Sequence, residues 1–568
     1  MFHLSFSLLG VLMAVVMYAV SVSPSLLPRP WWWHAFVSGI ALTMGYCLGW
    51  LVENVGTGLL RFLDIHITAS AFATRLLMWC GLAALSLWAL RLIVLSAFAM
   101  NREARMIGAT PQTLGRYFLG VLGSLVMFAT LMVLVGIIVA LYIKGVNMLA
   151  PFMPHMVAAV VQGIITVVVV LLIANKIVFR FIMKIFAHDA AKRDNRIVSS
   201  VNRPSQPERS ASPESLCSWQ SVGAQGRAFL SRGAHVEGIQ QLMGGPAMEP
   251  IRLYTGRSPH AGDYQSSADL LVREMERTGA LDRSVLLIYF TTGSGWVDEW
   301  SVQPMEYLTR GDCATVTMQY SYLFSAAILT TEMETCRESS RVLLRTVMDY
   351  VKKRPRESRP FIVVAGESLG AEGAQWPFEG VDELLDQVDG ALFVGAPATA
   401  PLSRLVTESR HRGSPEVAPV YDSGKNVRFI NQPDHLDKDI YGREYGRWFF
   451  PRVVFVQHAS DPVVWYRPRT MIWEPDWIRE RAGLDVSPYI RFTPFVTFLQ
   501  IIADLPMAGM APAGHGHTYQ EELAFVWVRL LGLGEKEAPY RGSVLSFSEA
   551  KITEMNLVIR EQLGVTGR

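Results

Sequence analysis

The sequence predicts two parts, an N-terminal α-helical transmembrane bundle and a C-terminal α/β domain with a mostly parallel sheet and helices on both faces. Three observations lead to this prediction. At 568 residues, the chain exceeds the usual length of one domain. Half of its residues are hydrophobic, and long apolar stretches are concentrated before about residue 186. Beyond residue 218, short β-branched runs alternate with helical patterns, as in a parallel sheet with crossover helices.

Five apolar stretches in the first part are each close to the ~20 residues that a helix needs to cross a bilayer. They are Phe2–Val22, Trp33–Val52, Leu76–Phe98, Phe118–Ile143 and Met156–Phe179. Trp31, Trp32, Trp33 and Tyr142 stand where interfacial aromatic residues belong. The first stretch has neither a basic leader nor a small-residue cleavage site, so we expect it to be retained.

Basic residues predict the orientation of these helices. Arg102, Arg105 and Arg116 flank spans on one side, together with Arg29. A second basic group follows the fifth span and contains Arg180, Lys184, Lys192, Arg193 and Arg196. Lys144 alone lies between the fourth and fifth spans. Because positive charge is enriched on the cytoplasmic side, we expect an external N-terminus and a cytoplasmic C-terminal domain.

Composition shifts predict the domain boundaries. The transmembrane domain should cover 1–190, a polar linker with several serines and prolines 191–218, and the α/β domain 219–535. A tail, 536–568, carries an amphipathic helix over Ser548–Leu563 that should dock on the domain. The strands that we expect are Ile251–Tyr254, Val285–Phe290, Ala314–Tyr320, Phe361–Ala365, Ala391–Val394, Val427–Ile430 and Val453–Gln457.

The stretch Gly366-Glu367-Ser368-Leu369-Gly370 carries the strongest chemical signal. An apolar strand precedes it and a run of small and polar residues able to open a helix follows. A strand, a G-x-S-x-G turn and a helix form a nucleophile elbow, in which the turn is strained and exposes the serine hydroxyl. The sequence therefore predicts Ser368 as a nucleophile.

A serine nucleophile needs a base and an acid that orients the base. Elbow enzymes place them after the serine, acid first and histidine last. Asp461 follows the late strand and is the predicted acid. His517 is the predicted base, with His515 as the alternative, since both lie in a glycine-bearing loop before a helix. His517 is preferred because it lies closer to that helix and so should be less mobile.

Other interpretations remain open at these positions. Asp461-Pro462 could be only a turn or a helix N-cap. Rival acids are Asp434, Asp437 and Asp439, which follow another strand. His458 is better explained as a packing residue at a strand end.

An oxyanion formed at the serine requires two backbone N–H donors. Leu369, directly after the nucleophile, should supply one. The other should come from the glycine-containing loop after the strand Val285–Phe290, with Thr292 as the expected residue. This loop lacks the lysine and the spacing of a phosphate-binding loop, so no nucleotide is expected.

The aromatic insert between Asp461 and His517 permits two interpretations. It could form a lid or acyl pocket over the serine, or it could contribute ordinary core packing. Five cysteines without metal-binding spacing suit a reducing compartment, and no metal or cofactor is expected. A net charge of +2 gives no indication of nucleic-acid binding.

Several stretches together resemble the bacterial membrane-anchored alpha/beta-hydrolase family, which joins a multi-helix N-terminal domain to a hydrolase domain. They are Ser23–Arg29, Gly223–Phe229, Pro250–Tyr254, Thr291–Val297, Gly311–Ala314, Gln319–Tyr322, Gly366–Gly370, Gln457–Val464 and Gly514–Tyr519. The resemblance implies an alpha/beta-hydrolase domain, hydrolase chemistry and a bacterial inner membrane, and leaves the substrate unspecified. With the predicted site, it favours a serine hydrolase acting on ester or lipid-like substrates. An acyltransferase with the same residues and a non-catalytic membrane scaffold are the alternatives.

Overall fold

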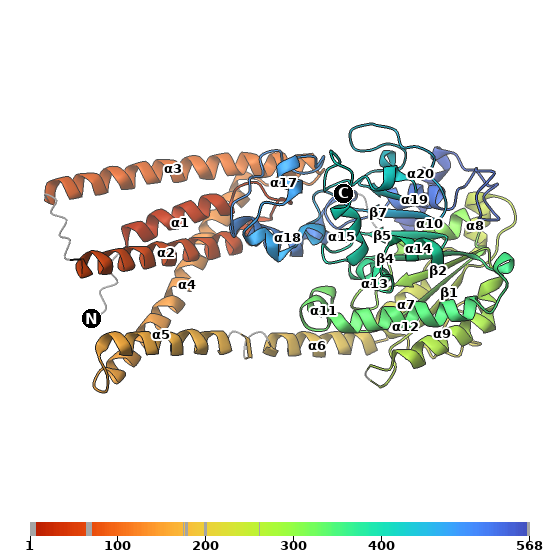
Figure 1. Ribbon diagram of the computed structural model, residues 1–568, viewed down its shortest axis with the longest axis horizontal. Coiled ribbons are helices and arrows are strands. Elements are labelled where there is room, and N and C mark those ends of the chain that lie inside the picture. The colour runs from red at the N-terminus through yellow and green to blue at the C-terminus, as the bar shows by residue number, and fades with distance from the viewer. Residues whose placement is uncertain are drawn as a thin grey trace. The chain divides into compact units, whose positions relative to one another are not determined.

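The computed structural model describes residues 7–63, 71–173, 175–176, 180–197, 201–260 and 262–564, which form two compact units (Figure 1). The first, here called the helical unit, contains Met1–Phe181, Pro468–Glu474 and Asp485–Met507. The second, the sheet unit, contains Ile182–Arg467, Pro475–Leu484 and Ala508–Arg568. Parts of the insert between Asp461 and His517 therefore belong to the helical unit.

The helical unit contains α1 (Leu8–Ser21), α2 (Trp31–Phe62), α3 (Ala71–Met106), α4 (Leu114–Leu149) and α5 (His155–Leu172). Within the described residues, four helical stretches, one in each of α2 to α5, are long and apolar enough to cross a membrane. They correspond to four of the five expected spans, although the last expected span ends in residues outside the described ranges. The first expected span, Phe2–Val22, begins in residues outside the described ranges. Its described part contains α1, whose 14 residues extend about 21 Å, less than the ~30 Å hydrocarbon core.

Two glycines explain how closely α1 and α2 approach each other. A Cβ atom on Gly45 would lie 2.4 Å from the carbonyl oxygen of Met13, and one on Gly49 would lie 2.4 Å from that of Leu9. Any side chain at these positions would force the helices apart. Small residues of this kind let apolar helices pack backbone to backbone.

The helix α18 (Val496–Asp504) joins the helical unit through a buried ion pair. Arg29 Nε donates to Asp504 Oδ1 at 2.9 Å, and both side chains are almost fully buried. The other carboxylate oxygen accepts from the backbone N–H of Leu26, at 3.1 Å, and from the hydroxyl of Ser25. Thus Ser23–Arg29, one of the stretches that carry the family resemblance, holds a carboxylate from a distant part of the chain.

The sheet unit is built on seven parallel strands in the order β1-β3-β2-β4-β5-β7-β6. Their bounds are β1 (Ile251–Thr255), β2 (Val285–Phe290), β3 (Cys313–Met318), β4 (Phe361–Glu367), β5 (Gly390–Val394), β6 (Val427–Ile430) and β7 (Arg452–Val456). Every strand expected from the sequence is present. The predicted fold class is confirmed.

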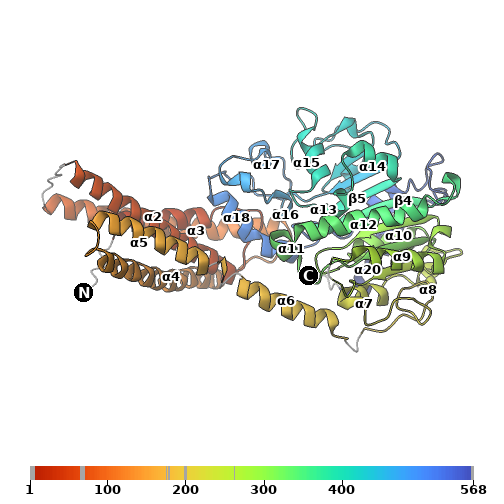
Figure 2. The ribbon, with the colours of Figure 1, turned by 60° about the horizontal axis from the view of Figure 1, so that its bottom comes forward.

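Alternate residues of β2 point into two hydrophobic cores, one on each face of the sheet. Val285 and Leu287 pack in the core shared with α10 (Glu299–Leu308), α19 (Glu522–Leu530) and α20 (Glu549–Gln562). Leu286 and Ile288 pack in the core shared with α9 (Tyr264–Thr278), α12 (Met333–Val351) and α13 (Leu369–Gln375). The long helix α12 lies beside α9 and α13 (Figure 2). The tail helix α20 buries Ile552, Met555 and Ile559 in the first core, so it docks on the domain as expected.

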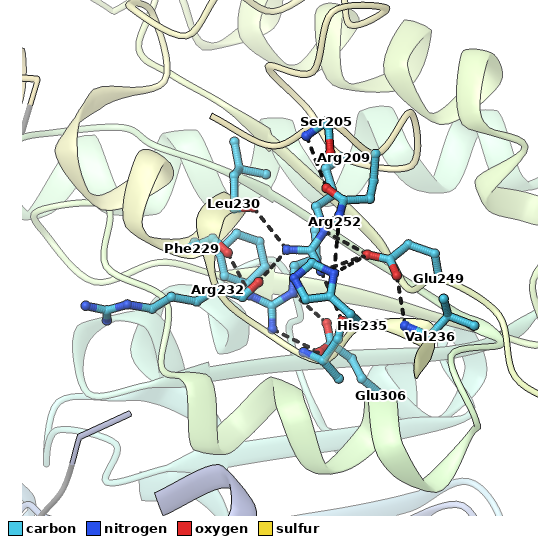
Figure 3. A network of polar contacts seen from close by, with 12 residues as sticks. Ser205, Arg209, Phe229, Leu230, Arg232, His235, Val236, Glu249, Arg252 and Glu306 are labelled. Atoms are coloured by element: carbon cyan, nitrogen blue, oxygen red, sulfur yellow. Dashed lines mark hydrogen bonds and ion pairs between the residues drawn. The ribbon is translucent and has the colours of Figure 1, made fainter. Parts of the chain in front are cut away.

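The expected polar linker, 191–218, is partly packed into the sheet unit. The helix α6 (Arg180–Asn195) occupies its start. Arg209 is fully buried and binds Glu249 at 3.0 Å, while Arg252 beside it pairs with Glu306 at 2.6 Å (Figure 3). Buried charges require such partners. The expected polar linker is therefore packed around Arg209, whose partner Glu249 lies forty positions further on, where local composition gives no indication of it.

Candidate active site

The strand order opens a crevice at the carboxyl ends of β2 and β4. From β2 the chain moves outward to β3 and then returns to place β4 on the other side of β2. The helix that follows β2, α10, lies on one face of the sheet, and the helix that follows β4, α13, lies on the other. Because the two connections leave in opposite directions, the loops separate and leave room for a ligand.

Ser368 stands between β4 and α13 in a strained turn. Its φ of 54° and ψ of −125° lie in a region that residues other than glycine rarely adopt. A Cβ atom on Gly370 would lie 2.1 Å from the carbonyl oxygen of Phe290, and one on Gly366 would lie 2.5 Å from the backbone of Gly370. Gly370 is therefore needed for the turn to fit against β2, and Gly366 for the turn to close on itself.

Asp461 and His517 are in direct contact. The Oδ2 atom of Asp461 lies 2.6 Å from Nδ1 of His517, and the carboxylate is fully buried. Its Oδ1 atom caps α16 (Pro462–Trp465) by accepting from the backbone N–H of Val463 at 2.9 Å. Asp461 is thus the N-cap of α16 and the partner of His517 at the same time, with one carboxylate oxygen for each contact. Since Nδ1 faces a carboxylate, the neutral ring carries its proton there.

Ser368 and His517 line one cavity of about 740 Å³. The Nε2 atom of His517 is buried and has no hydrogen-bond partner among the described atoms. Acidic residues at the cavity are Asp298, Glu299 and Glu367, and aromatic ones are Trp296, Trp300, Phe324 and Tyr519. A hydroxyl on a strained turn and an imidazole nitrogen without a partner therefore face the same space.

Two matches to known families cover most of the chain. Residues 251–538 match the alpha/beta-hydrolase family, and residues 22–234 match the N-terminal region described for an alpha/beta-hydrolase family. The chain belongs to the alpha/beta-hydrolase family. Members of this family are generally hydrolases. No curated protein matches the chain.

The rival acids of this alpha/beta-hydrolase have other partners. Asp434 binds Lys438 at 2.9 Å, Asp437 pairs with Arg529, and Asp439 binds Arg443 at 2.6 Å. None of the three is among the described residues that line the cavity with Ser368. This placement favours Asp461 over them.

The other two histidines considered from the sequence lie differently from His517. His458 is buried, stacks on Tyr519 with ring centroids 4.2 Å apart, and lies 3.2 Å from Glu522. This arrangement agrees with a packing role. His515 is not one of the described residues that line the cavity, and its backbone N–H donates to Pro512.

The two expected oxyanion donors of the hydrolase differ in availability. Leu369 is the first residue of α13, so its N–H has no acceptor within the helix. The N–H of Thr292 instead donates to the carbonyl of Trp296 at 3.1 Å. Thr292 thus lines the cavity, but its amide is engaged in a turn of its own loop, which the sequence did not indicate.

Sequence reasoning overlooked a carboxyl pair beside Ser368. Glu367, the residue before Ser368, and Asp298, which follows the loop after β2, are both buried and line the same cavity. Burial raises the pKa of Asp298 to about 6. Burial, reinforced by the charge of Asp298, raises the pKa of Glu367 well above its usual value. The acidic residue inside the elbow motif was the only signal available in the sequence.

Proposed function

We propose that this protein is a membrane-anchored serine hydrolase that cleaves ester bonds, with Ser368 as nucleophile, His517 as base and Asp461 as the acid that orients the base. The observation that carries the proposal is one cavity lined by both Ser368 and His517. The contact between Asp461 and Nδ1 of His517 supports it, because it leaves Nε2 available to accept a proton.

The first half of the reaction forms an acyl-enzyme. The Oγ atom of Ser368 attacks the ester carbonyl carbon while Nε2 of His517 accepts the hydroxyl proton. The tetrahedral intermediate collapses, the bond to the alcohol oxygen breaks, and the imidazolium gives its proton to the departing alcohol. Asp461 remains ionised and stabilises the imidazolium.

The second half releases the acid. A water molecule gives a proton to Nε2 of His517 and attacks the acyl carbon. The bond to Ser368 Oγ then breaks as that oxygen recovers the proton. In both halves the N–H of Leu369 donates to the oxyanion, and Thr292 becomes the second donor when its amide leaves the carbonyl of Trp296.

The lining of the cavity and the helical unit favour lipid-like esters. Trp296, Trp300, Phe324 and Leu563 supply apolar surface near the serine. Four described helices are apolar enough to hold the protein in a membrane, where esters with long acyl chains are concentrated. An acyl chain packed against such side chains gains about 0.8 kcal/mol per buried methylene.

Labelling with a fluorophosphonate probe tests the proposal on the full chain in detergent. Wild type should be labelled covalently, and Ser368→Ala should not. Ser339→Ala is the matched control, because Ser339 is buried in α12, bonds to the carbonyl of Cys336, and is not among the described lining residues. Unlabelled wild type would favour a non-catalytic scaffold, and labelling that persists in Ser368→Ala would exclude this nucleophile.

A series of fluorogenic esters of increasing acyl length then identifies the substrate class. We expect kcat/KM to rise with chain length. Adding an alcohol acceptor separates hydrolysis from acyl transfer, since a transferase would form a new ester in place of the free acid.

A further inference from the structure

We propose that Glu367 and Asp298 share a single proton and that this bridge positions the loop after β2 against the nucleophile turn. Both are positioning residues, because they act through Ser368 and through the loop 291–297 that follows β2. The inference rests on the function proposed above for Ser368.

The pair joins the two segments that the reaction needs. Glu367 is the last residue of β4 and is bonded covalently to Ser368. Asp298 follows the loop 291–297 and caps α10. Both side chains line the cavity, and the two residues are only 4% and 3% exposed. A bond between these carboxyls therefore connects the loop directly to the serine.

Two neighbouring carboxyls that are both buried hold a proton between them, because two adjacent ionised carboxylates repel each other strongly in a buried site. The donors around the pair indicate where the proton resides. Asp298 accepts from the N–H of Trp300, at 3.2 Å, and from the N–H and hydroxyl of Ser301, at 2.7 and 2.8 Å. The Oε2 atom of Glu367 has no hydrogen-bond donor among the described residues. Asp298 is therefore the carboxylate and Glu367 the acid that donates to it.

The neighbouring elements disfavour a second negative charge at the pair. Asp461 and Glu522 act on Glu367 through repulsion. From β2, the Tyr289 hydroxyl accepts the N–H of Asp298 at 3.2 Å, and Tyr519 is also close enough to feel the charge of Glu367. His517 lines the same cavity, and His458 lies 3.2 Å from Glu522.

Loss of the shared proton has two consequences for the reaction. The two carboxylates repel, so the loop is released from the turn. A further negative charge also appears beside the carbonyl oxygen that becomes negative in the transition state, which destabilises that state. Alkaline pH should therefore lower kcat and leave KM nearly unchanged.

Three variants of the full chain test this role through the pH profile of kcat and of the fluorophosphonate labelling rate. Glu367→Gln should remove the alkaline loss seen in wild type, because its amide donates to Asp298 at every pH. Glu367→Ala should lower kcat at least about tenfold at all pH values, with KM changed less than about threefold, since misplacement of the loop affects mainly the transition state. Glu372→Gln should retain the wild-type profile.

Glu372 is a close control because it is also a buried carboxyl with a raised pKa, and it lies in α13, the helix that follows the turn at Ser368. It binds Thr399 at 3.0 Å and is not one of the described residues at the cavity. Thermal melting of each variant shows whether it is folded. If Glu367→Ala does not fold, the comparison of Glu367→Gln with wild type decides.

Equal alkaline profiles for wild type and Glu367→Gln would overturn the inference, as would an unchanged kcat in Glu367→Ala. Infrared spectra at neutral pH detect the proton without any activity. Glu367→Gln should lose a carboxylic-acid C=O band that Glu372→Gln keeps, and retention of every such band would refute the shared proton. Unlabelled wild type would refute the proposed function and the positioning role with it, whereas labelled wild type with unchanged variants would refute this inference alone.

Discussion

The hydroxyl of Tyr519 donates a hydrogen bond to Oδ2 of Asp461 at 2.8 Å, the same oxygen that contacts His517. The hydroxyl also accepts the backbone N–H of His458 at 3.1 Å. One tyrosine thus ties the loop that carries Asp461 to the loop that carries His517. Burial raises the pKa of Tyr519 well above its usual value, so the hydroxyl keeps its proton and remains a donor.

Replacing Tyr519 with phenylalanine should loosen the Asp461 carboxylate. We expect kcat to fall about three- to tenfold and the free energy of unfolding to fall by about 1 kcal/mol, the usual contribution of one hydrogen bond. Steady-state kinetics and thermal melting measure both. Tyr441→Phe, at an exposed tyrosine, should change neither, and an unchanged kcat in Tyr519→Phe would contradict a role in holding the acid.

Asp461→Asn should lower turnover about 10³- to 10⁴-fold, because the amide favours the wrong imidazole tautomer and does not stabilise its charged form. The measurement is kcat on the best ester found. Asp434→Asn is the control, since Asp434 binds Lys438 at the surface. The reverse outcome, with Asp434→Asn damaged and Asp461→Asn active, would show that the acid has been misplaced.

The two histidines of the loop should respond differently. His517→Ala should abolish acyl-enzyme formation, because it removes the imidazole that lines the cavity with Ser368. His515→Ala should retain it, with at most a modest change in rate. Rapid-mixing measurement of the acyl-enzyme distinguishes them. Loss in His515→Ala with retention in His517→Ala would assign the base to His515.

The buried ion pair between Arg29 and Asp504 should stabilise the helical unit only while both partners are present. Asp504→Ala leaves the guanidinium of Arg29 buried without its carboxylate, and breaking such a pair costs about 3–5 kcal/mol. The melting temperature in detergent should fall accordingly, and Arg29→Met with Asp504→Leu should restore most of it. Asp189→Ala breaks the exposed pair with Arg193 and should change stability by less than about 1 kcal/mol. A similar small effect for Asp504→Ala would contradict the burial of the pair.

Reporter fusions test the orientation. The basic residues before α4 and in α6 predict that a C-terminal reporter is cytoplasmic. A reporter before α1 should be external if α1 crosses the membrane and cytoplasmic if only α2 to α5 cross. An external C-terminus would overturn the predicted topology.

Local patterns predicted the strands and the elbow because each depends on neighbouring residues. The run Phe361–Ala365 and the glycines beside Ser368 are sufficient to indicate a strand followed by a tight turn. Partnerships between distant positions could not be predicted in this way. Asp504 contacts Arg29, which lies 475 positions away in the sequence. Glu367, at the end of β4, lines the same cavity as Asp298, which follows the loop after β2. Neither carboxyl belongs to a pattern that marks burial, so both resembled ordinary polar residues until the fold brought the partners together.

The attachment of α18 to the helical unit has a consequence for the origin of the protein. The chain changes from one unit to the other five times, after Phe181, Arg467, Glu474, Leu484 and Met507. A hydrolase gene joined end to end with a membrane anchor would change only once. A fragment that begins at residue 219 would keep Asp504 but lose its partner Arg29. Separating the two halves of the chain would therefore leave the carboxylate of Asp504 without its guanidinium partner.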